Sequence, residues 1–428
     1  MSSSSPPQTK PWVSTPCILS AALSRSAGCN IYLKLETLQP SGSFKSRALG
    51  NFLSKAILAH RPSKPVHFYC ASGGNAGLAC VVAATMLKRP ATIVVPMSTS
   101  VLMIEKLKNL GADVVQIGAH WSEADTYLRE ELLGKDEDGV YVPPFDHELL
   151  WEGNSTIVDE LEEQMSPKGG YDALVCSVGG GGLFSGVMQG LERHGKLLSG
   201  KGQTVKVLAV ETKGAESLNL SVTNKRLLRL PAITSIAPSL GATQVASQAF
   251  EWGMKDDVTS HVLSDAEAAM ACVNFADDER ILVEPACGVS IAPAYNDTLH
   301  SLLYPTLSPE EFAKLNIVLI VCGGSNVTIQ ILDEYRETYS QDRDVLEKFH
   351  SRRIREEGAK AVPTKLQAEP RIPFILHNEE EHKRDDVLAQ ARGRNFEGEQ
   401  VVPRPAIGTM TLGEMERQIE EFGKVVKP

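Results

Sequence analysis

The sequence predicts an α/β fold with two domains, each a mostly parallel sheet flanked by helices. Apolar runs bounded by Gly and Pro recur through the first ~340 of the 428 residues. Many of these runs are continuous rather than alternating, as in parallel strands that are buried on both faces. Segments with apolar residues three and four positions apart lie between the runs and indicate helices. This alternation of strands and helices favours layered α/β domains.

The individual strands and helices follow from these two patterns. The apolar runs predict strands at residues 31–36, 66–70, 91–95, 114–117, 173–176, 205–210 and 317–321. The helical spacing predicts helices at residues 46–59, 76–87, 101–110 and 183–194. A chain of this length is sufficient for two or three domains with a sizeable core.

Charge and hydropathy exclude several classes of protein. The chain has 43 basic and 53 acidic residues and a formal net charge of -10, whereas a general nucleic-acid-binding protein needs a basic surface. Met1–Pro7 does not combine a basic region with an apolar core, so no secretory signal is expected. Arg is scarce before Arg25, which argues against a mitochondrial presequence. No apolar run approaches the ~20 residues of a membrane span.

The eight cysteines are scattered along the chain, and none forms a Cys-x-x-Cys pair. Neither a metal-binding knuckle nor a disulfide framework is therefore expected. Reduced thiols in a cytoplasmic protein are the simplest interpretation.

Residues 341–428 differ in composition from the rest of the chain and form a C-terminal extension. They include 16 basic and 17 acidic residues among 88. Residues 359–405 are rich in Pro and charge, so the extension is expected to be partly flexible. Thr411 and Glu414 have the spacing of a capping box, and the apolar residues behind them predict a short terminal helix at 412–422.

The first of three glycine-containing loops, Pro40–Arg47, places Lys45 after a Ser/Gly turn and at the start of a predicted helix. The positive end of the helix dipole disfavours the protonated form of an amine there. Such a site suits a lysine that acts as a nucleophile or carries an imine. Taken alone, however, Lys45 is better explained as an exposed lysine at a helix start.

The second loop, Ala71–Gly77, joins a predicted strand to a predicted helix. Its small residues let the backbone approach a ligand, and the helix N-terminus offers N–H groups that would fit a substrate carboxylate. An ordinary tight turn explains this loop equally well.

The third loop, Ser177–Leu183, contains four consecutive glycines. Each glycine would cost ~1 kcal/mol inside a helix, whereas in a loop the backbone N–H groups can surround a phosphate. The loop is neither a Gly-x-Gly-x-x-Gly nor a Walker sequence, so dinucleotide and nucleoside triphosphate sites lack their signature. Two further segments, 283–288 and 321–326, are predicted to open a helix and to end a strand.

Together, in this order and spacing, these segments resemble those of the catabolic L-serine/L-threonine dehydratases (serine ammonia-lyases). These are pyridoxal-phosphate enzymes of the tryptophan-synthase-β fold, also called fold type II. The resemblance runs from about Thr15 to about Leu332 and rests on residues 39–45, 72–77, 143–146, 151–153, 177–183, 283–288 and 321–326. It implies a large cofactor-binding domain of residues 1–37 and 145–340 and a small domain of residues 38–144. The cofactor would lie in the cleft between them.

The resemblance also implies roles for individual residues. Lys45 would hold pyridoxal 5′-phosphate as an imine and move the α-proton, and Phe44 would lie against the pyridine ring. Asn75 would hydrogen-bond the ring hydroxyl, and Cys322 would face the pyridine nitrogen. The phosphate would bind at Gly179, Gly180, Gly181, Gly182 and Leu183, and the substrate carboxylate at Ser72, Gly73 and Asn75.

Members of the family hold a monovalent cation. The resemblance therefore implies a K+ site at Gly179, Glu211, Ala215, Leu240 and Ala242. It also implies a cytoplasmic homodimer that acts on a small amino acid in amino-acid catabolism and gluconeogenesis, with no nucleic-acid or membrane partner.

The implied reaction is α,β-elimination of water from L-serine, followed by loss of ammonia to give pyruvate. L-Threonine would give 2-oxobutanoate. Another enzyme of the same fold is an alternative, namely a β-replacement synthase, a threonine synthase or an amino-acid racemase. A non-catalytic homologue that binds the cofactor is a further alternative, against which the intact Lys45 and Asn75 argue.

Cys322 bears on the choice among these reactions. A thiol is uncharged at neutral pH, so it cannot keep the pyridine nitrogen protonated as an aspartate would. The cofactor is then a poorer electron sink, and elimination coupled to removal of the α-proton is favoured over racemisation. The alternative is a buried cysteine that packs as a small apolar residue.

Overall fold

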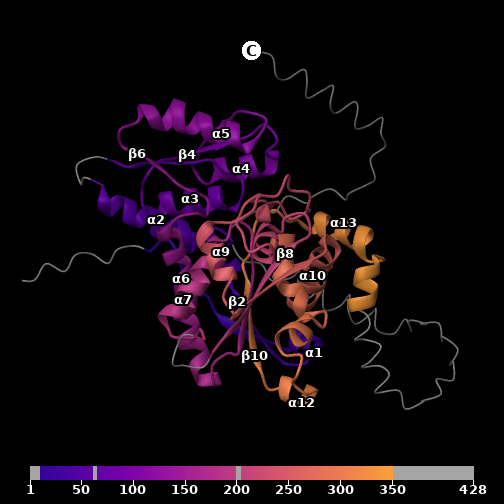
Figure 1. The fold of residues 1–428 in the computed structure, drawn as a ribbon. Helices are drawn as coiled ribbons and strands as arrows, with labels where there is room; N and C mark the ends of the chain where they lie inside the picture. The colour runs from indigo at the N-terminus through magenta and orange to yellow at the C-terminus, as the bar shows by residue number, and fades with distance from the viewer. Residues whose placement is uncertain (1–9, 61–64, 199–203, 350–428) are drawn as a thin grey trace, which may run out of the picture. The chain divides into compact units, whose positions relative to one another are not determined.

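Two sheets organise the residues that this computed structural model describes, 10–60, 65–198 and 204–349 (Figure 1). All of these residues belong to one compact unit of the chain, Met1–Ala361. The predicted flexible region at 359–405 and the predicted helix at 412–422 lie outside the described residues.

The larger sheet has six strands in the order β1-β2-β10-β7-β8-β9. β1 pairs antiparallel with β2, and the other neighbours pair parallel. All of β7 and nearly all of β10 is buried, which explains their continuous apolar sequences. The strands are β1 (Cys17–Ser20), β2 (Asn30–Leu35), β7 (Ala173–Ser177), β8 (Lys206–Thr212), β9 (Val258–Leu263) and β10 (Asn316–Val321).

The smaller sheet has four parallel strands in the order β5-β4-β3-β6. The strands are β3 (His67–Cys70), β4 (Ala91–Val95), β5 (Asp113–Gln116) and β6 (Gly139–Tyr141). They lie between β2 and β7 in the chain, so the smaller sheet is inserted within the sequence of the larger one. The domain boundaries at 37/38 and 144/145 stay a prediction.

Helices separate and cover the strands of both sheets (Figure 1). Helix α6 packs against α2 and α7, and α10 packs against α11 and α13. The helices are α1 (Ala21–Ala27), α2 (Lys45–Ala59), α3 (Asn75–Met86), α4 (Val101–Asn109), α5 (Trp121–Tyr127), α6 (Glu148–Met165), α7 (Gly182–Arg193), α8 (Ser217–Thr223), α9 (Ser247–Gly253), α10 (Asp265–Glu279), α11 (Pro285–Ile291), α12 (Pro309–Phe312) and α13 (Ile329–Tyr339).

The strands and helices predicted within the described residues are all present, and their bounds differ from the predicted ones by at most two residues. The apolar pattern missed β1, β6 and β9, each of which is the last strand at one side of its sheet. Exposure alone does not explain this, because the edge strand β5 is also partly exposed and was predicted. The missed strands β1 and β6 have only four and three residues, and the polar residues Thr259, Ser260 and His261 interrupt the apolar sequence of β9.

The start of the predicted C-terminal extension is part of the folded core. Residues 343–349 are helical, and Val345 and Phe349 join the main hydrophobic cluster. The Phe349 ring lies 5.9 Å from the Tyr295 ring, centroid to centroid. The core therefore extends beyond Ser340, where the change in composition begins.

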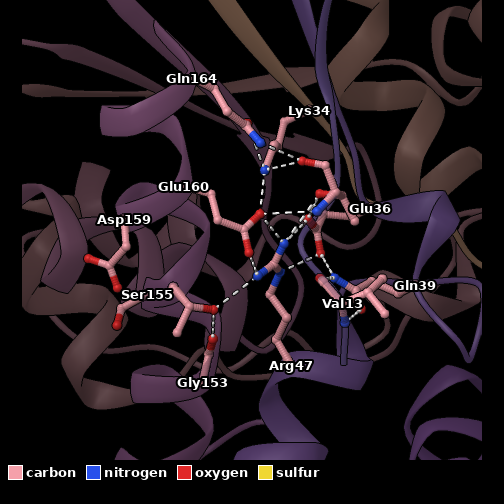
Figure 2. Close-up of polar contacts among 12 residues, drawn as sticks. Val13, Lys34, Glu36, Gln39, Arg47, Gly153, Ser155, Asp159, Glu160 and Gln164 are labelled. Carbon is pink, nitrogen blue, oxygen red and sulfur yellow. Dashed lines mark hydrogen bonds and ion pairs between the residues drawn. The ribbon is translucent and has the colours of Figure 1, made fainter. Parts of the chain in front are cut away.

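A buried network of charged side chains holds β2, α2 and α6 together (Figure 2). The Arg47 guanidinium donates to both carboxylate oxygens of Glu36, at 2.7 Å each. It also donates to Glu160 at 2.5 Å, and Glu160 accepts from Lys34 Nζ at 2.6 Å. The side chains of Lys34, Glu36 and Arg47 are fully buried, so the ion pairs balance charges that water does not reach.

Glu160 shows how strongly this network favours the charged forms. Burial raises the pKa of Glu160, but the hydrogen bonds and charges of Arg47 and Lys34 outweigh burial and hold the pKa below its usual value. Since Arg47 is two residues from Lys45, the network also fixes the first turn of α2.

Replacing Arg47 should therefore destabilise the fold. Arg47→Met leaves Glu36 as an uncompensated buried charge, and we expect the free energy of unfolding to fall by about 3–5 kcal/mol. Urea unfolding followed by circular dichroism measures this change. Lys55→Met is the matched control on the same helix, because Lys55 pairs with Glu152 and both side chains are about 40% exposed (42% and 41%). The control should lose less than about 1 kcal/mol, and equal losses in both variants would contradict the assigned importance of the network.

Candidate active site

A cavity of about 710 Å³ brings the predicted glycine-containing loops together. Loops and helix starts that connect the strands of both sheets line it. The predicted site residues that line the cavity are Phe44, Lys45, Ser72, Gly73, Asn75, Gly179, Gly180, Gly181, Gly182, Leu183, Leu240, Ala242 and Cys322. Two predicted cation ligands, Glu211 and Ala215, are fully buried and do not line the cavity.

The backbone before Lys45 is paired with the segment that follows β10. Phe44 N–H donates to the Cys322 carbonyl at 3.0 Å, and Gly324 N–H donates to the Gly42 carbonyl at 3.0 Å. A Cβ atom at Gly323 would lie 2.3 Å from the Gly42 carbonyl oxygen, so only glycine allows this approach. This pairing, called the 42–44/322–324 seam below, places Lys45 relative to the larger sheet.

Lys45 lines the cavity, and its amine is buried. Lys45 is the first residue of α2, and its Nζ donates to the Pro144 carbonyl at 2.6 Å. Burial lowers the pKa of Lys45 to about 8, while nearby Cys70 and Cys322 act in the opposite direction. Burial, rather than the helix dipole expected from the sequence, is thus the main cause that disfavours the protonated amine. A lysine with this pKa is partly neutral near physiological pH and can act as a nucleophile.

The Ser177–Leu183 loop presents a row of unused hydrogen-bond donors to the cavity. Among the described residues, none accepts a hydrogen bond from the backbone N–H groups of Gly179 to Leu183. Gly181 has φ +90°, which L side chains rarely adopt. Buried N–H groups are nearly always satisfied, so a row of free donors at the start of α7 fits a phosphate.

Phe145 supports this glycine loop from behind. A Cβ atom at Gly180 would lie 2.4 Å from the Phe145 ring, and one at Gly182 would lie 2.7 Å from the Phe145 carbonyl oxygen. Trp151 Nε1 donates to that same carbonyl at 3.0 Å. Residues 143–146 and 151–153 are part of the family resemblance but had no predicted role. These contacts indicate that Phe145 and Trp151 support the glycine loop.

The Ala71–Gly77 loop forms another wall of the cavity at the N-terminus of α3. Gly74 N–H donates to Ser72 Oγ at 3.4 Å, and a Cβ atom at Gly77 would collide with the Ser72 carbonyl. Gly74 differs, because no atom lies within 4 Å of a Cβ placed there. The loop is therefore tightly turned at Gly77 and open towards the cavity at Gly74.

Asn75 is held by residues from the part of the chain that forms the larger sheet. Its Nδ2 donates to Glu284 Oε1 at 2.8 Å, and its Oδ1 accepts from Ser325 N–H at 2.9 Å. Ser239 Oγ lies 3.2 Å from Nδ2. The contact with Glu284 connects the start of α3, in the segment of the smaller sheet, with the start of α11, in the segment of the larger sheet.

Cys322 is buried in the cavity wall, where other cysteines and the Lys45 amine are nearby. It is 4% exposed, and its Sγ is 3.6 Å from Ser177 Oγ. Three other cysteines, Cys176, Cys272 and Cys287, lie close enough to interact electrostatically with Cys322. Burial raises the pKa of each of these three thiols. All eight cysteines of the chain are buried free thiols.

The predicted cation ligands include one buried carboxylate. Both oxygens of Glu211 accept from backbone N–H groups at the start of α8, those of Leu218 at 2.8 Å and Asn219 at 2.7 Å. Burial raises the pKa of Glu211 to about 8. Gly179 and Leu240 are in backbone contact, since a Cβ atom at Gly179 would lie 2.8 Å from Leu240 Cα.

Several residues that line the cavity were not among the predicted site residues. Glu284 stands out, because it is a charged residue in an otherwise apolar segment, and that contrast was a usable signal. Nothing in the sequence marks Trp121, whose Nε1 donates to the Ala71 carbonyl at 2.5 Å. The same is true of Arg229, which donates to Thr243 Oγ1 at 3.0 Å.

A lysine of lowered pKa across a cavity from free N–H groups fits a phosphorylated aldehyde cofactor that is held on the lysine. Residues 9–323 match the pyridoxal-phosphate dependent enzyme family, and the chain belongs to it. The predicted α/β fold of fold type II is thereby confirmed.

The chain is similar to proteins named for serine and threonine breakdown. The L-serine dehydratase/L-threonine deaminase of Bos taurus is 44% identical over 334 residues, which are 77% of this chain and 96% of the relative. The catabolic L-serine/threonine dehydratase of Saccharomyces cerevisiae is 36% identical and covers 75% of this chain and 90% of its own length. A fungal L-serine ammonia-lyase from Rhizomucor miehei matches with a TM-score of 0.69 at 35% identity, over 77% of this chain and 99% of that one.

A serine racemase from maize shares the fold, with a TM-score of 0.63 at 23% identity, over 76% of this chain and 94% of that one. This likeness concerns the fold alone. Within the described residues, no helix is both long enough and apolar enough to span a membrane.

The lowered pKa of Lys45 makes a prediction about cofactor attachment. Only the neutral amine attacks an aldehyde, so the attachment rate of pyridoxal 5′-phosphate to cofactor-free protein should rise with pH and level off above about pH 8. Stopped-flow absorbance of the bound cofactor measures this rate, with Lys45→Ala as the blank. A rate that keeps rising towards the ordinary lysine value of 10.5 would contradict the assigned environment.

Proposed function

We propose that this enzyme eliminates water from L-serine, and that hydrolysis of the released enamine, after it becomes an imine, takes up water again and gives pyruvate and ammonia. L-Threonine is proposed as a second substrate, which gives 2-oxobutanoate and ammonia in the same way. The observation that carries the proposal is that Lys45 and the free N–H groups of Gly179 to Leu183 face one cavity. The dehydratase names of relatives 36–44% identical to this chain support the choice of reaction. When bound, pyridoxal 5′-phosphate supplies the electron sink for charge at the substrate α-carbon.

Lys45 is the proposed base in this reaction. Its Nζ takes the proton from the substrate α-carbon, and its lowered pKa supplies neutral amine at the pH of the reaction. The Pro144 carbonyl orients the amine. The Phe44 ring, whose centroid is 5.3 Å from Nζ, is proposed to cover one face of the cofactor ring.

The remaining site residues are proposed to bind and orient. Gly179, Gly180, Gly181, Gly182 and Leu183 hold the cofactor phosphate with their N–H groups, and Asn75 holds the ring hydroxyl. The substrate carboxylate binds at Ser72, Gly73 and Asn75, where α3 begins. The helix N-terminus favours the negative charge of the carboxylate.

Cys322 is proposed to favour elimination over racemisation. Its thiol would face the pyridine nitrogen of the bound cofactor, and the buried thiols of Cys176, Cys272 and Cys287 lie near it. A neutral partner leaves the cofactor a weaker electron sink, so loss of the β-hydroxyl is coupled to removal of the α-proton. A thiol rather than a carboxylate at this position supports the dehydratase reaction over the racemase alternative.

The fit of a K+ ion rests on Glu211. Its partners among the described residues are backbone N–H groups and no cationic side chain, so a bound cation would balance the charge of a fully buried carboxylate. Carbonyl oxygens of Gly179, Ala215, Leu240 and Ala242 would complete the oxygen ligands that K+ prefers.

The proposal also includes a cytoplasmic homodimer. Its support is an apolar edge: β1 is the first strand of the larger sheet, and Ile18 and Leu19 are 41% and 52% exposed there. Exposed edge strands are commonly covered by a second chain. Eight free thiols are consistent with a reducing compartment.

An assay for ammonia and 2-oxo acid from L-serine, with no added nucleophile, tests the proposed reaction. We expect equal amounts of ammonia and pyruvate from the parent protein. Lys45→Ala should lower turnover by at least ~10²–10⁴-fold, because it removes the general base. Gly74→Ala is an informative companion: its Cβ meets no protein atom, so the protein should fold normally and bind substrate less well.

Other products would identify the alternatives. D-Serine without pyruvate would establish a racemase, and product formation that requires a second nucleophile would establish a β-replacement synthase. A protein that binds the cofactor and turns over neither amino acid would be a non-catalytic homologue.

Removal of the cation makes a separate prediction. Activity should fall when K+ is replaced by tetramethylammonium, and it should return when K+ is added back. In Glu211→Gln the half-saturating K+ concentration should rise by at least about tenfold, because an anionic ligand is lost. Parent activity that is independent of K+ would remove this site from the proposal.

A further inference from the structure

Among the described residues that line the cavity, Glu284 alone carries a carboxylate. It is 2% exposed, although burial of a charged group is costly unless hydrogen bonds compensate for the lost water. Glu284 stands at the N-cap of α11, yet its side chain makes no capping hydrogen bond to that helix. Its carboxylate therefore serves something other than the start of α11.

The partners of the Glu284 carboxylate are all hydrogen-bond donors. Asn75 Nδ2 donates to Oε1 at 2.8 Å, and Asn326 N–H donates to Oε2 at 2.9 Å. The Ser239 hydroxyl also donates to the carboxylate. A carboxylate only accepts hydrogen bonds, whereas a protonated acid would need an acceptor. The surroundings therefore match the ionised form.

These contacts determine which way the Asn75 carboxamide points. Its Nδ2 faces Glu284 and its Oδ1 accepts from Ser325 N–H at 2.9 Å. A flipped amide would set an oxygen against the carboxylate and an NH2 group against the Ser325 N–H group. The second Nδ2 hydrogen has only the longer contact to Ser239 Oγ, at 3.2 Å, and is the one a ligand in the cavity can use.

The chain leaves space for this carboxylate. A Cβ atom at Gly324 would lie 2.2 Å from the Glu284 carboxyl carbon, so no other residue type fits there without moving Glu284. Gly324 also belongs to the 42–44/322–324 seam. Glu284 is therefore seated against the same segment that positions Lys45.

We propose that Glu284 is a positioning residue, which holds the Asn75 carboxamide so that an N–H group points at the ring hydroxyl of the cofactor. Asn75 begins α3 in the segment of the smaller sheet, and Glu284 begins α11 in the segment of the larger one. The position of Glu284 in the segment of the larger sheet thus determines how Asn75, in the segment of the smaller sheet, contacts the cofactor. The inference rests on the proposed role of Asn75.

Opposing influences act on the charge of Glu284. Burial is the largest and raises the pKa of Glu284 overall, while the hydrogen bonds from Ser239, Asn326 and Asn75 lower it. The charge of Lys106 lowers it further, and Lys106 Nζ donates to the Ser325 carbonyl at 3.0 Å. The donors and the nearby cation thus favour the carboxylate that the geometry requires.

Glu284→Gln tests the inference. Gln keeps one acceptor oxygen and replaces the other with an NH2 donor. This NH2 group would then face the N–H donor of Asn75 or of Asn326, so one hydrogen bond is lost. Asn75 then loses its fixed orientation. We expect the Kd for pyridoxal 5′-phosphate to rise by roughly 10- to 100-fold, the value of a hydrogen bond to a charged group. The absorption band of the bound cofactor should also shift, because its ring hydroxyl loses a donor.

Glu267→Gln is the matched control for a purely structural effect. Glu267 is 1% exposed, accepts from Asn296 Nδ2 at 3.2 Å, and does not line the cavity. Its variant should lower the urea midpoint of the cofactor-free protein at least as much as Glu284→Gln does. It should leave the cofactor Kd and the absorption band unchanged.

A double-mutant cycle with Asn75→Ala separates the two roles. In the Asn75→Ala background, Glu284→Gln should change neither Kd nor the absorption band further, because Glu284 acts through Asn75. Additive effects on Kd would overturn the inference, as would an unchanged Kd in Glu284→Gln when Asn75→Ala alone weakens binding. An Asn75→Ala protein with parental Kd and spectrum would instead refute the proposed role of Asn75, and the inference with it.

Discussion

The 42–44/322–324 seam is the constraint on which the arrangement of the cavity depends. Two backbone hydrogen bonds, Phe44 N–H to the Cys322 carbonyl and Gly324 N–H to the Gly42 carbonyl, join the turn before α2 to the end of β10. On the far side of Lys45, Arg47 is tied to Glu36 and Glu160 in the buried ion network (Figure 2). The backbone of Lys45 is thus held from both sides. Little backbone conformational freedom remains to be lost when Lys45 reacts.

The glycines of the site serve close packing and ligand binding at once. Gly180 lies against the Phe145 ring and Gly179 against the Leu240 backbone, so a side chain at either position would collide with protein atoms. The same approach turns the N–H groups of the loop towards the cavity. One conformation of the Ser177–Leu183 loop thus provides both the close packing and the donors that face the cavity. A glycine substitution in this loop would therefore change packing together with cofactor binding, whereas Gly74→Ala changes the cavity surface alone.

The parts of the fold that sequence predicted are those that local patterns specify. Buried central strands such as β7 and β10 have continuous apolar sequences, and α2, α3 and α7 begin directly after glycine-containing turns. The edge strands β1 and β6 were missed because they are only four and three residues long, and β9 because polar residues interrupt its apolar sequence. The partners of Glu284 could not be predicted, because Asn75 lies 209 positions away in the chain and the contact arises from pairing of distant segments. The composition change at Gln341 was also misleading about the core, since Val345 and Phe349 are buried beyond it.

The distribution of charge in the cavity connects these features to the proposed reaction. Lys45, Arg229 and Glu284 are the charged residues among the described lining residues, and the negative one is at the Asn75 side. The Cys322 side has thiols that burial keeps protonated. If the cofactor ring lies between Asn75 and Cys322 as proposed, no anion stabilises a proton on its nitrogen. Negative charge at the α-carbon is then poorly delocalised, and the pathway that avoids accumulating it is the one in which the β-hydroxyl leaves as Lys45 removes the α-proton.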